Sequence, residues 1–243
     1  MVSTPVSIAA VIADAGLAAL LIAGLAFIAR AQRRASVLWI GGAAVLGWLG
    51  LAFVLAKSGF FETTAQTSLP PRIGPAIVIP TVLGCALVAV ASVRRLIAAV
   101  PLHWLVGVQV YRVVGGLFLI AWLQDDMPGE FALPAGIGDV TVGLLAPFVA
   151  LLLVRGGVER AWPAVVAWCA LGITDLVIAV TCGLLTAPSA FQQLALDDPN
   201  EAITSYPLVL IPAFAVPVSV ILHVYVLARL SMRAQEAPRA QLA

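Results

Sequence analysis

Long apolar runs separated by short polar connections cover almost the whole chain. Seven such runs follow one another, at residues 8–29, 36–56, 74–93, 101–123, 133–154, 162–186 and 207–229. A bilayer core of roughly 30 Å needs about 20 apolar residues in helical form. The runs are too long for core strands and lack the apolar–polar alternation of a transmembrane barrel. The pattern therefore predicts an all-α fold, a bundle of seven transmembrane helices.

The composition agrees with this pattern and limits what else the chain can contain. Of the 243 residues, 62% are hydrophobic and 10% are charged, and the mean hydropathy is +1.08. These values lie far from those of soluble domains. Because almost every residue belongs to a predicted helix or a short connection, we predict one membrane domain over residues 1–243. The first run follows MVSTPVS rather than a basic leader, which predicts a retained first helix.

The positions of the basic residues predict the orientation. Cytoplasmic connections of membrane proteins collect Lys and Arg. Ten of the thirteen basic residues follow the first, third, fifth and seventh helices: Arg30, Arg33, Arg34, Arg94, Arg95, Arg155, Arg160, Arg229, Arg233 and Arg239. The opposite connections carry most of the acidic residues, so we expect the N-terminus outside and the C-terminus in the cytoplasm. This asymmetry suits a multi-pass protein of a bacterial-type plasma membrane, with the lipid bilayer as its partner and no nucleic acid.

Six polar side chains lie within the predicted helices and are the candidate functional residues. They are Asp14, Gln109, Arg112, Asp139, Asp175 and His223. An ionisable group at membrane depth is costly, so it normally faces the bundle interior and finds a partner. Because the helices over 101–123 and 133–154 are joined by a short connection, Asp139 is the expected partner of Arg112, with Asp175 second. The planar guanidinium suits bidentate pairing with carboxylates.

Small residues accompany these charges at helical spacing. In the run over 133–154 they are Gly136, Gly143, Ala146 and Ala150, on the face of Asp139, and the runs around Asp175 and Asp14 repeat the pattern. Such stripes permit close approach of helices. The face of Gln109 and Arg112 is predicted to continue to Gly116. Four prolines, Pro80, Pro147, Pro212 and Pro217, are predicted to interrupt helices, and the last two indicate a bend in the seventh helix near a cavity.

Cofactor chemistry finds little support in the sequence. His103 and His223 are the two ligands that a b-type haem would need, but their aromatic neighbours, Trp104 and Tyr225, favour ordinary anchors at the membrane interface. The cysteines form no CxxC pair, which argues against a zinc site. The layout is similar to that of microbial rhodopsins, yet the run over 207–229 has no lysine to hold retinal. We therefore expect neither a cofactor nor a metal.

Three functional hypotheses remain open. In the first, Asp14, Gln109, Arg112, Asp139 and Asp175 line the pathway of a small transporter or channel for a proton or small solute. Because three aspartates face one arginine, one carboxyl is expected to hold a proton. In the second, the chain is a membrane-embedded enzyme that acts on a lipid or isoprenoid, with Asp175 or Asp139 as general acid. In the third, it is a structural subunit of a membrane complex. The sequence does not decide whether the protein is an enzyme or a homo-oligomer.

Overall fold

The regular structure is helical throughout the part of the chain that the structure describes. The computed structural model describes residues 3–64 and 71–240, with side chains as far as Met232. The α-helices are α1 (Thr4–Ala31), α2 (Ala35–Lys57), α3 (Ile73–Ala86), α4 (Ala91–Ala99), α5 (Leu102–Gly107), α6 (Gly116–Leu123), α7 (Gly129–Thr186) and α8 (Val216–Ala240). Short 3₁₀-helices lie at η1 (Leu87–Ala89), η2 (Val108–Gly115) and η3 (Ala202–Thr204), and η4 (Ile211–Ala215) is a π-helix. The predicted all-α class is confirmed.

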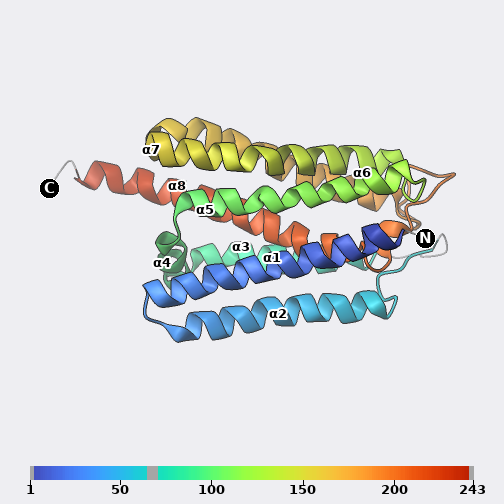
Figure 1. Cartoon of the computed structure of the whole chain (residues 1–243), viewed down its shortest axis with the longest axis horizontal. Helices are drawn as coiled ribbons and strands as arrows, with labels where there is room; N and C mark the ends of the chain where they lie inside the picture. Colours follow the sequence, from blue (N-terminus) through green and yellow to red (C-terminus); the bar gives the residue numbers. More distant parts are fainter. Residues whose placement is uncertain (1–2, 65–70, 241–243) are drawn as a thin grey trace.

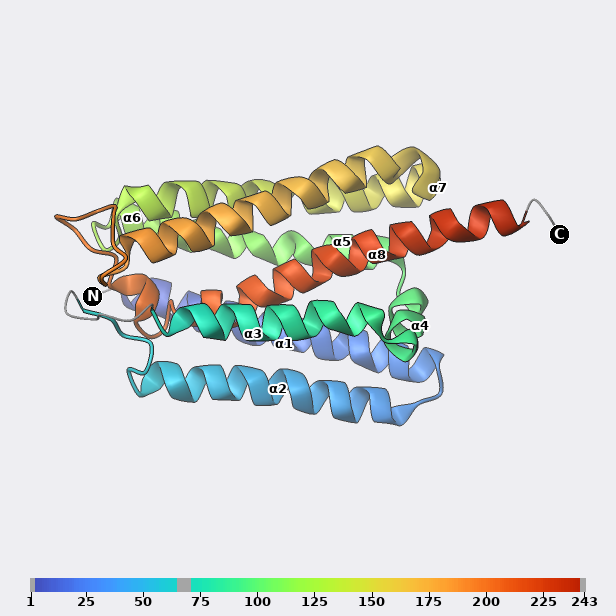
Figure 2. The ribbon, with the colours of Figure 1, turned by 180° about the vertical axis from the view of Figure 1, so that it is seen from behind.

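Several helices are long and apolar enough to cross a membrane. Within the described ranges these are Thr4–Ala31, Ala35–Lys57, Leu102–Leu123, Gly129–Thr186 and Ile211–Met232, and the bent pair Ile73–Ala89 and Ala91–Ala99 qualifies as a sixth. The helix α7 has 58 residues and contains one non-helical position, Gly157, with φ 71° and ψ 174°. At that point α7 doubles back, so that its two halves lie side by side (Figures 1 and 2). The fold is therefore compatible with a multi-pass membrane protein.

The third predicted helix, over residues 74–93, is wrong at its C-terminal end. The chain leaves the helix at Val90, which has an extended backbone, and α4 then turns by 91° (Figure 1). The sequence of α4 explains the turn, because Arg94 and Arg95 follow each other in this nine-residue helix. Two charged side chains favour a position at the end of the bundle over a position within an apolar layer.

The helix α8 occupies the middle of the bundle. It lies between α3 on one side and the pair α5 and α7 on the other, while α1 and α2 pack together at the edge (Figures 1 and 2). In its most apolar stretch, 61% of the residues are buried, against 17% for α1 and 11% for α2. The large apolar side chains of α1 and α2, such as Ile12 and Trp39, are exposed instead. Their outward faces therefore have the character of a surface in contact with lipid.

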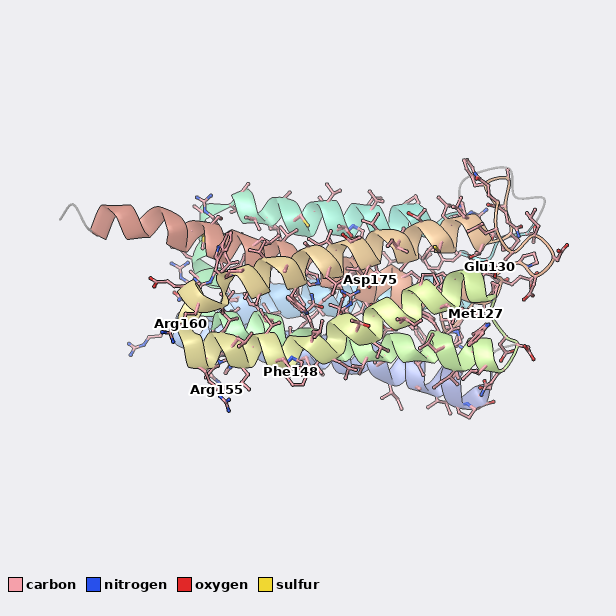
Figure 3. The ribbon with its side chains drawn as sticks, turned by 90° about the horizontal axis from the view of Figure 1, so that it is seen from above. Met127, Glu130, Phe148, Arg155, Arg160 and Asp175 are labelled. Atoms are coloured by element: carbon pink, nitrogen blue, oxygen red, sulfur yellow. The ribbon has the colours of Figure 1, made fainter. Side chains whose placement is uncertain are left out.

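Basic and acidic residues gather at opposite ends of the bundle. Arg155 and Arg160 lie at the end where α7 reverses, and Glu130 lies at the other end (Figure 3). At the acidic end, the connections that contain Asp125 and Asp198 line one open hollow. The side chains of Arg233 and Arg239, which the sequence assigns to the basic end, are outside the described residues. The separation of charge along the bundle is the one that the sequence predicts.

Candidate functional site

Every nitrogen of the Arg112 guanidinium has a polar partner. Nε donates to Oδ1 of Asp139 over 2.7 Å, and Nη2 lies 2.7 Å from the same oxygen and donates to Oδ2 of Asp175. Nη1 lies 3.3 Å from the carbonyl oxygen of Gly172 and 3.3 Å from Nε2 of His223. The Arg112 side chain is 1% exposed. A buried guanidinium is tolerated when its charge is paired and its donors are satisfied, and both partners predicted from the sequence are present.

The 3₁₀-helix η2 sets the direction of the arginine. In a 3₁₀-helix, residues three apart lie on the same face, and the buried residues of η2 are Gln109, Arg112 and Gly115. The prediction that this face continues to Gly116 assumed an α-helix and is wrong, because eight residues here are wound more tightly. Gly115 is the residue that faces Asp139, and a Cβ at Gly115 would overlap the carboxyl group of Asp139.

Glycines on α7 give the charged side chains their room. A Cβ at Gly172 would overlap the ring of His223 and would lie 3.1 Å from Nη1 of Arg112. A Cβ at Gly138 would overlap the carboxylate of Asp175. The two halves of α7 carry Asp139 and Asp175, and Figure 3 places Asp175 midway along the bundle. The small-residue stripes predicted from the sequence are therefore the surfaces on which the cluster is built.

His223 lies in this cluster, and its interpretation as an interfacial anchor is wrong. The residue is fully buried, its ring lies 4.6 Å from that of Trp168, and Nε2 faces Arg112. The sequence predicts a helix that ends near residue 229, which would put His223 close to the membrane interface. Instead, α8 continues to Ala240, so His223 lies well inside the helix. Because a guanidinium only donates, Nε2 of His223 is the acceptor. His103 is half-buried on α5 and its ring contacts that of Trp104. This contact does not relate His103 to the Arg112 cluster.

The start of α8 is irregular where it passes the cluster, as its prolines predict. The π-helix η4 precedes α8, and the lack of an N–H at Pro217 removes a donor for the carbonyl of Ala213. Nε1 of Trp48 donates to that carbonyl over 3.2 Å, and the hydroxyl of Tyr111 donates to the carbonyl of Ala215 over 3.0 Å. Groups freed by the irregular backbone are thus satisfied from α2 and η2. Pro80 and Pro147 lie inside α3 and α7, where each lacks the N–H of a helical hydrogen bond but does not end the helix.

Asp14 lies beside the ion pairs and faces a small polar cavity. The cavity has a volume of about 20 Å³, and its polar lining consists of Asp14, Tyr111, Arg112, Asp139 and Ser219. Asp14 is 3% exposed, and its Oδ2 has no hydrogen-bond partner among the described residues. A cavity of at least about 10–15 Å³ can hold one water molecule. This space is therefore large enough for one water molecule, and Asp14 and Arg112 are among the polar residues that line it.

Two further buried atoms near Arg112 lack partners within the described part of the chain. They are Oε1 of Gln109 and Nδ1 of His223. The other end of the Gln109 amide is fixed, since Nε2 donates to the carbonyl of Ser219 over 3.1 Å, and the hydroxyl groups of Tyr111 and Ser219 are hydrogen-bonded to each other. Buried polar atoms are normally satisfied by protein or ordered water. Together with Oδ2 of Asp14, they are three buried polar atoms in or beside the Arg112 cluster that have no partner among the described residues.

An apolar pocket adjoins the cluster at Asp139. Its volume is about 90 Å³, and Asp139 and Thr204 are its polar lining residues. The pocket and the polar cavity share Asp139, Leu176, Ile211 and Val216 in their linings. Asp139 thus separates a water-sized polar space from a larger apolar one, an arrangement that the sequence pattern gives no means to predict.

The structure brings together most of the residues predicted for the site. Arg112, Asp139, Asp175 and His223 are joined by ion pairs and hydrogen bonds, and Asp14 adjoins them in the lining of the polar cavity. Gln109 is held beside this cavity through the carbonyl of Ser219, which also lines it. Sequence reasoning missed Tyr111 and Ser219. Their spacing does carry a signal, since Tyr111 adjoins Arg112 and Ser219 lies one helical turn before His223. No group of three or more His, Cys, Asp or Glu side chains in the described residues is arranged to hold a metal ion.

Comparison with known proteins places the cluster within a family. No curated protein and no solved structure matches the chain. A family model matches residues 82–231, a segment that contains Arg112, Asp139, Asp175 and His223 and begins after Asp14. Because this match covers more than half of the sequence, the chain belongs to the family described as a domain of unknown function (DUF8737).

Proposed function

We propose that this protein moves protons across a membrane through the polar cluster around Arg112. The observation that carries the proposal is Asp14, a buried carboxyl whose Oδ2 has no partner among the described residues and which shares a water-sized cavity with Arg112 and Asp139. Intramembrane ionisable residues commonly mark proton relays. The proposal extends to this chain the role that such residues have in pumps and transporters.

The balance of charge supports a proton as the cargo. Arg112 faces the carboxyl groups of Asp139 and Asp175, and Asp14 adds a third carboxyl to the same site. With all three ionised, the site would hold two uncompensated negative charges, which is costly away from water. A proton taken up by one carboxyl reduces this cost. Release of that proton is favoured when a water molecule in the cavity accepts it, so uptake and release need no large rearrangement of Arg112.

The irregular helices at this depth also support a pathway. Non-helical backbone within a membrane is tolerated where it is buried in protein or lines a wet cavity. Both η2 and η4 line the polar cavity, through Tyr111 and Ala215 among others. Tyr111 and Ser219 supply hydroxyl groups next to Asp14, and a hydroxyl both donates and accepts. In this proposal, a water molecule in the cavity links Asp14 to these two hydroxyl groups, which are hydrogen-bonded to each other.

The topology that we propose has seven spans, with the two halves of α7 counted separately at Gly157 and with α3 as a span that ends before α4. The end of the bundle with Arg155 and Arg160 faces the cytoplasm. At a fusion point after Ala243, a reporter enzyme that works only in the cytoplasm is expected to be active, and one that works only after export is expected to be inactive. In the connection at Asp198, the opposite result is expected. The reverse pattern would contradict the orientation.

Replacement of Asp14 by asparagine tests the proton function. Asn keeps the size of the side chain but cannot release a proton, so we expect proton flux to fall at least about tenfold while the fold is retained. The measurement is the acidification of proteoliposomes that contain the purified protein, followed with an internal pH dye under an imposed membrane potential. Asp198→Asn is the matched control, since it makes the same change at an exposed position of the acidic end, and its flux is expected to equal that of the wild type.

Two results would contradict the proposal in different ways. If the wild type gives no flux above that of protein-free liposomes, proton movement is wrong and the cluster acts as a structural or catalytic element. If the wild type conducts and Asp14→Asn conducts equally well, the pathway does not use Asp14. Thermal unfolding of each variant in detergent separates these outcomes from a loss of fold.

A further inference from the structure

The apolar pocket beside Asp139 has the features of a binding site for a molecule from the bilayer. Its lining residues come from α3, α6, α7, η3, η4 and α8. Ile73, Gly74 and Ile77 of α3 form one side, and the second half of α7, from Leu176 to Leu184, forms the other. Phe118 and Phe131 close it toward α6, and Pro212 and Val216 form its floor. These side chains offer an alkyl chain dispersion contacts on several sides.

The mouth of the pocket opens through the apolar wall of the bundle. Gly74 and Val180 on its lining are half-buried, and Leu184 is exposed. The same two helices carry exposed apolar side chains elsewhere, such as Ile79 on α3 at 57% and Val177 on α7 at 60%. An apolar pocket between helices with such outward faces is accessible to molecules from the lipid. Its occupant is therefore a membrane-soluble molecule.

The size of the pocket limits what enters. Its volume is about 90 Å³, and an engineered apolar cavity of roughly 150 Å³ binds benzene. A whole phospholipid does not fit such a space. A single chain does fit, with its polar end and first few carbon atoms inside the pocket and its remaining carbon atoms among the lipids.

The inner end of the pocket selects the polar group of that chain. Oδ1 of Asp139 accepts hydrogen bonds from Arg112, and a carboxylate has lone pairs for further donors. A second anion would be repelled, because the carboxyl groups around Arg112 already outnumber it. A cation would have to cross the apolar mouth, which is costly for a charged group. A neutral hydrogen-bond donor, such as the hydroxyl group of an alcohol, is neither repelled by the carboxyl groups nor excluded by the apolar mouth.

We propose that this pocket binds a single-chain alcohol from the bilayer, with the hydroxyl group donating to Asp139 and the chain lying between α3 and α7. The proposed alcohol site and the polar cavity share Asp139, Leu176, Ile211 and Val216 in their linings, but the test of alcohol binding needs no proton flux, so the two proposals can fail separately. Occupation would stabilise the folded protein, because a ligand that binds only the folded state raises its stability in proportion to the logarithm of its concentration.

Thermal unfolding of the full-length protein in detergent tests this site with three probes of equal chain length. 1-Decanol is the donor, its methyl ether lacks the donor, and decanoate carries a negative charge. We expect the midpoint temperature to rise at a decanol concentration at least tenfold below that needed with either of the other two. Equal shifts with the alcohol and the ether would overturn recognition of the hydroxyl by Asp139.

Substitutions at the pocket locate the binding. A Cβ at Gly183 would point toward the ring of Phe131, 3.4 Å away, so Gly183→Leu fills the pocket. Gly74→Leu is a second filling variant, because Gly74 lines the pocket and a Cβ there would meet nothing within 4 Å. Both are expected to lose the decanol shift. Gly47→Leu, on α2 and also with open space, is the matched control and is expected to keep it. A shift that persists in both filling variants would overturn the site.

Discussion

Replacement of Arg112 by methionine is expected to lower the free energy of unfolding by about 3–5 kcal/mol, the cost of removing one partner from a buried ion pair. Met fills part of the same space but leaves the carboxyl groups of Asp139 and Asp175 without the donors that now reach them. Nε2 of His223 and the carbonyl of Gly172 lose their donor as well. The measurement is equilibrium unfolding of the purified protein in mixed micelles.

A compensated variant separates loss of charge balance from loss of packing. Arg112→Met combined with Asp139→Asn and Asp175→Asn removes the charges together, and buried ionic groups replaced as a set often cost little. We expect this triple variant to recover most of the lost stability and to show no proton flux. Arg112→Lys is the second control, since it keeps the charge but not the planar fork of donors, and it should lie between the wild type and Arg112→Met. A single Met variant as stable as the wild type would show that the ion pairs do not hold the helices together.

Gly172→Ala is expected to destabilise the protein by about 1–3 kcal/mol, the usual cost of overpacking a filled interior. The added methyl group would overlap the ring of His223 and press on Nη1 of Arg112. Both neighbours are buried, so they can give way only if the centre of the bundle repacks. Thermal unfolding gives the stability, and the same samples in the flux assay are expected to conduct less than the wild type.

The matched control for Gly172→Ala is Gly50→Ala. Gly50 also lies within an α-helix, but a Cβ at this position would meet nothing within 4 Å. Ala is a better helix former than Gly by up to about 1 kcal/mol, so Gly50→Ala is expected to be neutral or slightly stabilising. If both substitutions change stability by the same amount, the space at Gly172 is not what the cluster requires.

The sequence predicts the helices and the central ion pairs well, for a physical reason. Apolar runs long enough to span a bilayer are rare in other contexts, and a charge inside such a run has few partners to choose from. Arg112 is the one basic residue in the middle of a predicted helix, so its pairing with Asp139 and Asp175 follows from the scarcity of alternatives. The buried small residues beside Asp139 and Asp175 follow from the need for close helix packing.

The sequence predicts the irregular helices only in part. Pro212 and Pro217 indicate a break, but not that the break is a π-helix or that Trp48 and Tyr111 satisfy its carbonyl groups. No residue type marks η2 as a 3₁₀-helix, which is why Gly116 was predicted in place of Gly115. The depth of His223 depends on where α8 ends. The apolar pocket depends on the spacing of α3 and α7, which only the packed bundle defines.

The position of η4 before α8 makes the site sensitive to chain length. Each residue of an α-helix turns the chain by about 100°, and Ser219 and His223 share one face because they are four residues apart. Deletion or insertion of a single residue between Pro212 and Ser219 would rotate both side chains away from Gln109 and Arg112 together. Related sequences that keep this arrangement are therefore expected to align with the segment from Pro212 to His223 without insertions or deletions, whichever apolar residues they have there.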